Sequence, residues 1–497
     1  MRRLGFWLLL LVVIGVTVAF GGSAVRASVM TLVVSAIVLV TLLTGARRLL
    51  SFGGTPMAVA RVVADEAVRK SGVVAGAVAV LTLVCALPLL LDSESLLLFR
   101  TQSYMTYALA AATLALTLLT VFLSCDSLAG EISNRQIHLP AVKPVGRAGY
   151  LLGKWFGILV VNSVLLTSIG GAIAFLSWFP SVATTGVDAA EVADLRAGLL
   201  TSRKVCVPRP PAAFGSALDR AADRSWRSIA PGESEVYAFE GIAVPSTARE
   251  DALLRVRVKA FHNRAPLRVV FQFDGGPEVS QICVPDQVHE FALPAAAIAD
   301  GALEVTVRHP ADDGEPPFIF SRYEGLRVVY PDGDFLSNFL RGLLLLWTRL
   351  AVITAAGLFA SSFLGFPVAS LAVLLFVGTS SVSDFLLQDP HLRPETSAIR
   401  APEHDHSHGH GGHTHEPPAV SWAESFFNHL EVWGFRTAAA LSQYQRYDPH
   451  ERLVTGQRIE WREVGACLLW FGGGCGGALG LAAWLVFRRR ELARVQV

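Results

Sequence analysis

The sequence predicts an α-helical polytopic membrane protein with about eight transmembrane helices and an inserted extracytoplasmic all-β sandwich domain. Hydrophobic residues make up 52% of the chain and charged residues only 17%, whereas about a quarter of the residues of a soluble domain are charged. Long apolar runs alternate with short polar connections, and one central region has the composition of a soluble domain. The net charge of +1 provides no basic field for nucleic acid.

Residues 1–50 are predicted to form two transmembrane helices. The apolar runs Leu4–Phe20 and Val29–Leu43 are separated by a short Gly/Ser turn, and each approaches the ~20 residues that cross a bilayer. A cleaved signal peptide is the alternative for the first run.

Residues 51–179 are predicted to form the first part of a membrane core. The polar stretch Arg47–Lys70 has helical periodicity, with valines on one side, and is expected to lie at the interface or to be a solvated linker helix. Three apolar runs follow as expected spans: Val73–Leu91, Tyr104–Ser124 and Tyr150–Phe175.

The segment Cys125–Trp155 connects two of these spans. Its first part allows a short helix with one apolar face, and Pro140 and Pro144 then end the helix and fix a turn. Residues 125–149 are therefore expected to lie flat at the membrane interface. The positive charges beside the membrane are Lys143, Arg147 and Lys154.

The same segment resembles the cytoplasmic segment of type-2 ABC transporter permeases, the membrane subunits of ATP-binding cassette systems. The resemblance rests on three motifs in order: Ala129-Gly130-Glu131, Lys143-Pro144-Val145-Gly146-Arg147 and Gly153-Lys154. An ordinary basic loop on the inner side of a membrane is the alternative. The resemblance implies a separate ATPase subunit that binds Mg-ATP, and a second permease chain, either identical or related.

The resemblance also implies roles for single residues. Glu131 and Arg135 would contact the ATPase, and the basic residues would fix the depth of the segment at the lipid headgroups. The expected coupling residues are Glu131, Arg135, Lys143, Pro144, Arg147, Gly153 and Lys154.

The chain itself has no motif for nucleotide binding or catalysis. Gly146–Lys154 lacks the glycine spacing of a phosphate-binding loop, and Trp155 stands where Ser or Thr would bind magnesium. We therefore expect a protein that is not an enzyme and holds no cofactor of its own, with ATP hydrolysis in a partner subunit.

The distribution of Lys and Arg predicts the orientation. If both ends of the chain are cytoplasmic, most basic residues of short loops lie inside, and only Arg26 and Arg100 lie in short outside loops. The protein is thus expected in the cell's inner (cytoplasmic) membrane, with segment 125–149 inside.

Residues 180–334 are predicted to form the extracytoplasmic β-domain. Its expected strands are Glu235–Ile242, Leu253–His262, Leu267–Phe273, Val288–Leu293, Leu303–His309 and Phe318–Tyr330, after a possible short helix, Ser216–Ile229. Cys206 and Cys283 could form a disulfide or remain two thiols. Four aromatic residues could form a binding platform or belong to the core: Trp226, Tyr237, Phe239 and Tyr323.

The rest of the chain returns to the membrane. Residues 335–388 are predicted to form two spans, Phe339–Phe359 and Val368–Val382. Residues 389–460 are an external linker with an amphipathic interfacial helix at Ser421–Tyr444. Residues 461–497 contain the last span, Val464–Phe487, and a basic cytoplasmic tail.

A histidine-rich tract lies in the Pro-rich part of this linker. Alternate imidazoles can bind zinc or another divalent metal. The tract contains His404, His406, His408, His410, His413 and His415. Because the spans lack the His and Asp pairs expected of a metal pathway, metal carriage is the lesser alternative.

These patterns together predict a permease subunit of an exporter-type ABC transporter. Two other functions stay open: a secondary metal-ion transporter that uses the histidine tract, and a non-transporting sensor or assembly protein that displays its β-domain.

Overall fold

A computed structural model describes residues 22–91, 96–134, 146–182, 188–209, 228–242, 244, 252–260, 266–274, 276–285, 287–298, 301–310, 317–320, 325–388 and 447–489. The chain divides into two compact units. The helical unit comprises Met1–Asp188, Phe339–Glu451 and Ile459–Val497, and the β unit comprises Ala189–Asn338 and Arg452–Arg458.

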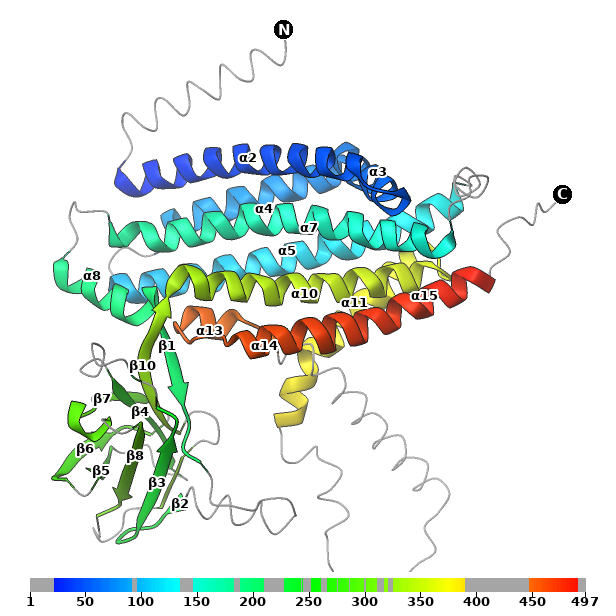
Figure 1. The fold of residues 1–497 in the computed structure, drawn as a ribbon. Coiled ribbons are helices and arrows are strands. Elements are labelled where there is room, and N and C mark those ends of the chain that lie inside the picture. Colours follow the sequence, from blue (N-terminus) through cyan, green and yellow to red (C-terminus); the bar gives the residue numbers. More distant parts are fainter. Residues whose placement is uncertain are drawn as a thin grey trace, which may run out of the picture. The chain divides into compact units, whose positions relative to one another are not determined.

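The helical unit is built from long apolar helices that run side by side (Figure 1). Its elements are α2 (Ser23–Leu49), η1 (Leu50–Phe52), α3 (Thr55–Arg69), α4 (Ser71–Leu90), α5 (Leu97–Ser133), α7 (Arg147–Trp178), η2 (Phe179–Ser181), α10 (Phe335–Ser361), α11 (Phe366–Gln388), α13 (His450–Val454), α14 (Trp461–Ala466), η8 (Cys467–Gly476) and α15 (Gly477–Arg489). The first residues of α10 and the last of α13 belong to the β unit.

Six segments of the described chain are long and apolar enough to cross a membrane. They comprise α2 with η1, α4, α5, α7 with η2, α10, and α14 with η8 and α15. Since ~20 apolar residues span a bilayer, the chain is a multi-pass membrane protein. The predicted run Leu4–Phe20 lies outside the described residues. The predicted run Val368–Val382 falls within α11, whose apolar part, Phe366–Ser381, is shorter than the six candidate spans.

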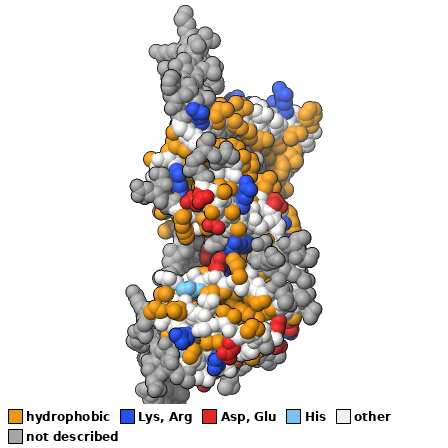
Figure 2. Space-filling model, turned by 90° about the vertical axis from the view of Figure 1, so that its left-hand side faces the viewer, with side chains coloured by type: hydrophobic (Ala, Val, Ile, Leu, Met, Phe, Trp, Pro, Cys, Tyr) orange, Lys and Arg blue, Asp and Glu red, His pale blue; other side chains and the backbone are white. Residues whose placement is uncertain are grey.

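Burial orders these helices from the centre of the unit outward. In the most apolar window of α10, 78% of the residues are buried inside the protein, compared with 67% in α7 and 11% in α2. Hydrophobic side chains also form much of the visible surface, with charged side chains among them (Figure 2). Thus α10 and α7 form the centre, and α2 presents most of its apolar surface outward, as a lipid-facing helix does.

The predicted interfacial helix is α3, and it packs closely on α7. A side chain at Gly153 would lie 2.6 Å from the carbonyl oxygen of Pro56, and one at Gly157 would lie 2.8 Å from that of Ala60. The buried face of α3 is rich in alanine rather than valine, because α7 comes so close; Val62, expected on the apolar side, is 60% exposed.

The β unit contains two antiparallel sheets. One sheet has the order β1-β10-β4-β9-β2, with β7 beside β4, and the other has the order β3-β8-β5-β6. The strands are β1 (Thr201–Cys206), β2 (Ser228–Ile229), β3 (Ser234–Glu240), β4 (Leu253–Ala260), β5 (Leu267–Phe273), β6 (Glu278–Cys283), β7 (Val288–Ala292), β8 (Ala302–Arg308), β9 (Phe318–Phe320) and β10 (Leu326–Asp334). Short helical turns are α8 (Ala189–Leu195), η3 (Arg196–Leu200) and η5 (Ala295–Ile298).

The predicted strands agree with these elements with three differences. The expected strand Phe318–Tyr330 is divided into β9 and β10, and β1 and β6 were not predicted. The expected helix at Ser216–Ile229 lies outside the described residues except at its end, where Ser228 and Ile229 form β2.

One hydrophobic core contains residues of both sheets. Tyr237 and Phe239 are each 1% exposed within it, so they belong to the core and not to a surface platform. Trp226 and Tyr323 lie outside the described residues.

Two cysteines also lie at this core. Cys283 is a buried free thiol, and Cys206 packs on the same core with its sulfur 4.0 Å from the hydroxyl of Tyr330. In the structure Cys206 and Cys283 are two separate thiols. Burial raises the pKa of the Cys283 thiol to about 12, which keeps it protonated and unreactive.

The segment Arg452–Arg458 joins the β unit from far along the chain. The amide of Arg203 donates to the carbonyl oxygen of Gly456 at 2.8 Å, and the amide of Arg458 donates back to Arg203 at 2.7 Å. Arg458 also forms an ion pair with Asp332 in β10. This segment was predicted as a linker before the last span, and it instead extends the edge of the sheet beside β1.

Candidate functional site

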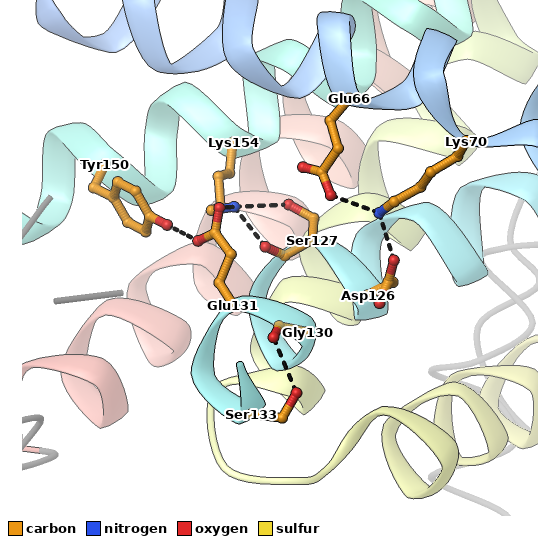
Figure 3. Close-up of polar contacts among 9 residues, drawn as sticks. All are labelled: Glu66, Lys70, Asp126, Ser127, Gly130, Glu131, Ser133, Tyr150 and Lys154. Atoms are coloured by element: carbon orange, nitrogen blue, oxygen red, sulfur yellow. Dashed lines mark hydrogen bonds and ion pairs between the residues drawn. The ribbon is translucent and has the colours of Figure 1, made fainter. Parts of the chain in front are cut away.

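The motif residues Glu131 and Lys154 meet where α5 ends and α7 begins (Figure 3). The ammonium of Lys154 lies 2.8 Å from a carboxylate oxygen of Glu131. Lys154 is 1% exposed, and the Glu131 side chain is 19% exposed. The two charges are thus an ion pair in the interior of the helical unit, where each needs the other.

Neighbouring groups form the other hydrogen bonds of Glu131 and Lys154. Lys154 also donates to the carbonyl oxygen of Ser127 and, at 3.2 Å, to its hydroxyl. The hydroxyl of Tyr150 donates to Glu131, and the Lys154 nitrogen lies 5.2 Å from the centre of the Tyr150 ring. We call Ser127, Glu131, Tyr150 and Lys154 the Glu131–Lys154 cluster.

Glycines make this arrangement possible. Because Gly153 has no side chain, α3 can approach α7, and the following residue, Lys154, is directed into the interior toward α5. In the Gly153-Lys154 motif, the glycine therefore lets α3 pack on α7, and the lysine after it supplies a buried cation.

A second ion pair joins α3 to α5 beside this cluster. Lys70, at the end of α3, lies 2.8 Å from Glu66 and forms a hydrogen bond with Asp126 of α5 (Figure 3). Burial lowers the pKa of Lys70, but the hydrogen bonds to Asp126 and Glu66 outweigh it, so the pKa is raised overall. The ammonium therefore stays charged at neutral pH.

Arg147, the first residue of α7, contacts the end of the last helix. Its guanidinium donates to the carbonyl oxygen of Phe487 at 3.3 Å and to that of Arg488. The Tyr150 ring stacks on the Phe487 ring with centroids 6.3 Å apart. Carbonyl groups at a helix end have no partner within the helix, so Arg147 caps α15 and fastens it to α7.

The structure brings together four of the predicted coupling residues: Glu131, Arg147, Gly153 and Lys154 lie around the adjoining ends of α5, α7 and α15. Lys154 is buried and not at the surface, where a lipid headgroup would lie. Three predicted residues lie outside the described residues, namely Arg135, Lys143 and Pro144.

Four further residues of this region were not singled out from the sequence: Lys70, Asp126, Ser127 and Tyr150. Tyr150 lies four positions before Lys154, so the helical repeat could have placed the two on one face. The contact between Lys70 and Asp126 joins distant parts of the chain, and no local pattern indicates it.

Another buried ion pair lies near the middle of α10. The guanidinium of Arg349 is 3.2 Å from a carboxylate oxygen of Asp448, and the side chain of Arg349 is 6% exposed. The same carboxylate contacts the imidazole of His450, whose Nε2 lies 3.2 Å from the hydroxyl of Thr113 in α5. We call Thr113, Arg349, Asp448 and His450 the Arg349–Asp448 cluster.

Charge and burial act against each other in this cluster. Burial raises the pKa of Asp448, but the hydrogen bond from His450 and the charge of Arg349 bring it down to about 2. Burial lowers the pKa of His450, but the contact with Asp448 outweighs this and raises it. The segment before α14 thus places Asp448 and His450 beside the middle of α10 and α5.

Among the described residues, no group of three or more His, Cys, Asp or Glu side chains is arranged to hold a metal ion. The histidine tract, His404 to His415, lies outside them, so metal binding there stays a prediction.

The comparisons with known proteins identify no relative: no family model, no curated protein and no solved structure matches the chain.

Proposed function

We propose that this chain is the membrane-spanning permease subunit of an exporter-type ABC transporter, driven by a separate ATPase subunit that binds Mg-ATP. The observation that carries the proposal is the Glu131–Lys154 pair. It fastens the two helices on either side of the segment between residues 134 and 146, so a force on that segment would move α5 and α7 together.

The neighbouring contacts extend this mechanical unit. Arg147 ties α7 to α15, Lys70 ties α3 to α5, and the Gly153 contact holds α3 on α7. Four helices therefore share one fastened end. A second permease chain, identical or related, would complete a pathway, and the basic segment between residues 134 and 146 would face the cytoplasm.

We propose a role for Glu131 that differs from the one expected from the sequence. Its carboxylate already accepts hydrogen bonds from Tyr150 and Lys154. In this proposal Glu131 holds the adjoining ends of α5 and α7 together and does not itself touch the ATPase. Arg135 and its neighbours would supply the contact, since they follow the fastened end of α5.

Site-specific photocrosslinking tests this proposal. A photoreactive phenylalanine analogue replaces Arg135 in the full chain, in membranes of cells that contain its natural partners, and a matched chain carries the analogue at Arg26. We expect the probe at position 135 to capture a protein with a phosphate-binding loop, and the probe at position 26 to capture none. Capture of no such protein from position 135, or labelling of position 135 from outside the cell, would overturn the proposal.

Two substitutions distinguish a residue that contacts the ATPase from a residue that joins α5 to α7. Arg135→Ala should lower copurification of the ATPase, because it removes the proposed contact. Glu131→Gln should leave copurification nearly unchanged but lower the stimulation of ATP hydrolysis by the permease. Equal loss of copurification in both variants would contradict the internal role of Glu131.

The Arg349–Asp448 cluster favours a second candidate, an ion-coupled secondary transporter. Ionisable groups inside the membrane often form ion or proton pathways, and this cluster supplies a carboxylate and an imidazole near the middle of two spans. Uptake that persists without any ATPase and disappears in Asp448→Asn would favour this candidate over the first.

A further inference from the structure

A cavity lies at the end of the helical unit where α4 ends and α5 begins. It has a volume of about 130 Å³, several times the space that one water molecule needs. Four helices contribute to its wall: α2, α4, α5 and α7. We call it the Tyr104 pocket, and define it by Ser28, Pro88, Arg100, Tyr104 and Leu176.

Two residues that line this pocket, Ser28 and Tyr104, carry hydroxyl groups without a hydrogen-bond partner among the described residues. Tyr104 is 3% exposed and Ser28 is 4% exposed, and both oxygens are buried. A buried polar group without a partner costs about 1–3 kcal/mol. Two such groups beside one cavity favour a polar molecule as its occupant, because a small side-chain rotation would give both hydroxyls a partner.

A cation stands beside these hydroxyls. Arg100 is half-buried, and one of its N–H groups donates to the carbonyl oxygen of Pro88 at 3.1 Å. A guanidinium has five N–H donors in a planar fork. The fork matches the oxygens of a phosphate or carboxylate, so Arg100 has donors left for an anion while Pro88 holds it in place.

The surroundings of the pocket are apolar. Leu91, Leu97 and Leu176 line it, and Leu90 and Phe99 beside it are 74% and 57% exposed. In a membrane-spanning helix such side chains face lipid. A ligand with its anionic end at Arg100 could therefore extend an apolar chain along this surface.

We propose that the Tyr104 pocket binds the phosphate-bearing head of an anionic phospholipid, whose acyl chains lie along the neighbouring helices. Arg100 would pair with the phosphate, and Tyr104 and Ser28 would donate hydrogen bonds to head-group oxygens. Because α2 supplies Ser28, the proposal also gives this peripheral helix a role. It goes beyond the proposed permease function and holds with or without an ATPase.

Native mass spectrometry of the full-length chain in detergent tests the proposal, with phosphatidylglycerol as the probe and phosphatidylcholine as the zwitterionic comparison. We expect one phosphatidylglycerol to bind at least about tenfold more tightly than phosphatidylcholine. Arg100→Gln should remove that preference, and Tyr104→Phe should weaken binding about threefold. Arg26→Gln is the matched control, because Arg26 is an exposed arginine of α2 outside the pocket.

Three results would overturn the proposal. One is equal binding of the two lipids, which indicates only unspecific lipid contact. Another is an equal effect of Arg100→Gln and Arg26→Gln. The third is binding of glycerol 3-phosphate as tight as that of phosphatidylglycerol, because the acyl chains would then contribute nothing. If Arg100→Gln does not fold, Arg100→Lys and Tyr104→Phe serve instead, and unchanged binding in both would overturn it as well.

Discussion

Among the described residues of the helical unit, two ion pairs with a buried cation differ in the chemistry of that cation. The Glu131–Lys154 cluster fastens the ends of α5 and α7 with an ammonium, whereas the Arg349–Asp448 cluster joins α10 to the segment before α14 with a guanidinium. Both cations are nearly inaccessible, and both have a carboxylate as partner.

The difference lies in what each cation can do when its partner leaves. An ammonium in an apolar interior can release its proton and become neutral, whereas a guanidinium stays charged in proteins. The first pair can therefore open at moderate cost, which suits a part that moves. The second pair has no neutral state on its cationic side, which suits a part that stays closed.

The strongest way to break this comparison is to remove one carboxylate from each cluster. We expect Asp448→Asn to lower the free energy of unfolding by about 3–5 kcal/mol, because a permanent buried charge loses its partner. Glu131→Gln should cost only about 1–3 kcal/mol, since glutamine can still accept hydrogen bonds and Lys154 can become neutral. Thermal unfolding in one detergent measures both.

Glu278→Gln is the control for this experiment. Its partner is Arg308 in the β unit, and both side chains are about half exposed, so the change should be within ~0.5 kcal/mol. A larger loss in Glu131→Gln than in Asp448→Asn would contradict the comparison.

Removing both charges of each pair sharpens the comparison. The double variant Glu131→Gln with Lys154→Met should be within about 1 kcal/mol of the natural chain, because no unpaired charge remains. The double variant Asp448→Asn with Arg349→Met should stay about 1–3 kcal/mol less stable, because His450 loses the negative charge that stabilises its cationic form. A double-mutant cycle with the single variants gives the coupling energies, and equal recovery in both clusters would refute the distinction.

The smallest expected effect is the pH dependence of the Arg349–Asp448 cluster. His450 faces Asp448 and Arg349, and its folded pKa is raised above the ordinary value, so its stabilising contribution is complete below about pH 6.5. The contribution is lost as the pH rises through the raised pKa. The contribution of Asp448 is present above about pH 4 and is lost as the pH falls toward its folded pKa of about 2.

The variant His450→Gln measures this effect. We expect the difference in melting temperature between the natural chain and the variant to be larger at pH 5.5 than at pH 9. A difference that is constant or grows with pH would show that His450 is not stabilised as a cation. Glu131→Gln, measured at the same pH values, is the reference for a cluster without histidine.

The membrane character and the β region could be predicted from the sequence, because both depend on local periodicity. The predicted strand Leu267–Phe273 is identical to β5, and the long apolar runs that the structure describes are helices. The first run, Leu4–Phe20, lies outside the described residues. β1 and β6 were missed because neither has the strict alternation of a half-buried strand: Thr201–Cys206 is only partly buried along its length, and most of Glu278–Cys283 is exposed.

The candidate site could be predicted only in part. The motif residues Glu131, Gly153 and Lys154 were found, but the sequence did not show that two of them face each other in the interior. Arg349 lies within the predicted span Phe339–Phe359, and its partner Asp448 lies in the segment 389–460, which was predicted as an external linker. Contacts between residues so distant in the chain have no local signature.

The order of synthesis has a consequence for α10. The ribosome makes Arg349 long before Asp448, so α10 first enters the bilayer before this carboxylate partner of Arg349 exists. An arginine at the centre of a membrane helix costs about 2.5–3.5 kcal/mol on insertion scales. We expect α5 and α7, which both contact α10, to retain the newly made helix until the segment that carries Asp448 arrives. A nascent chain that ends before Asp448 therefore holds α10 without the ion pair that joins this helix to the end of the chain.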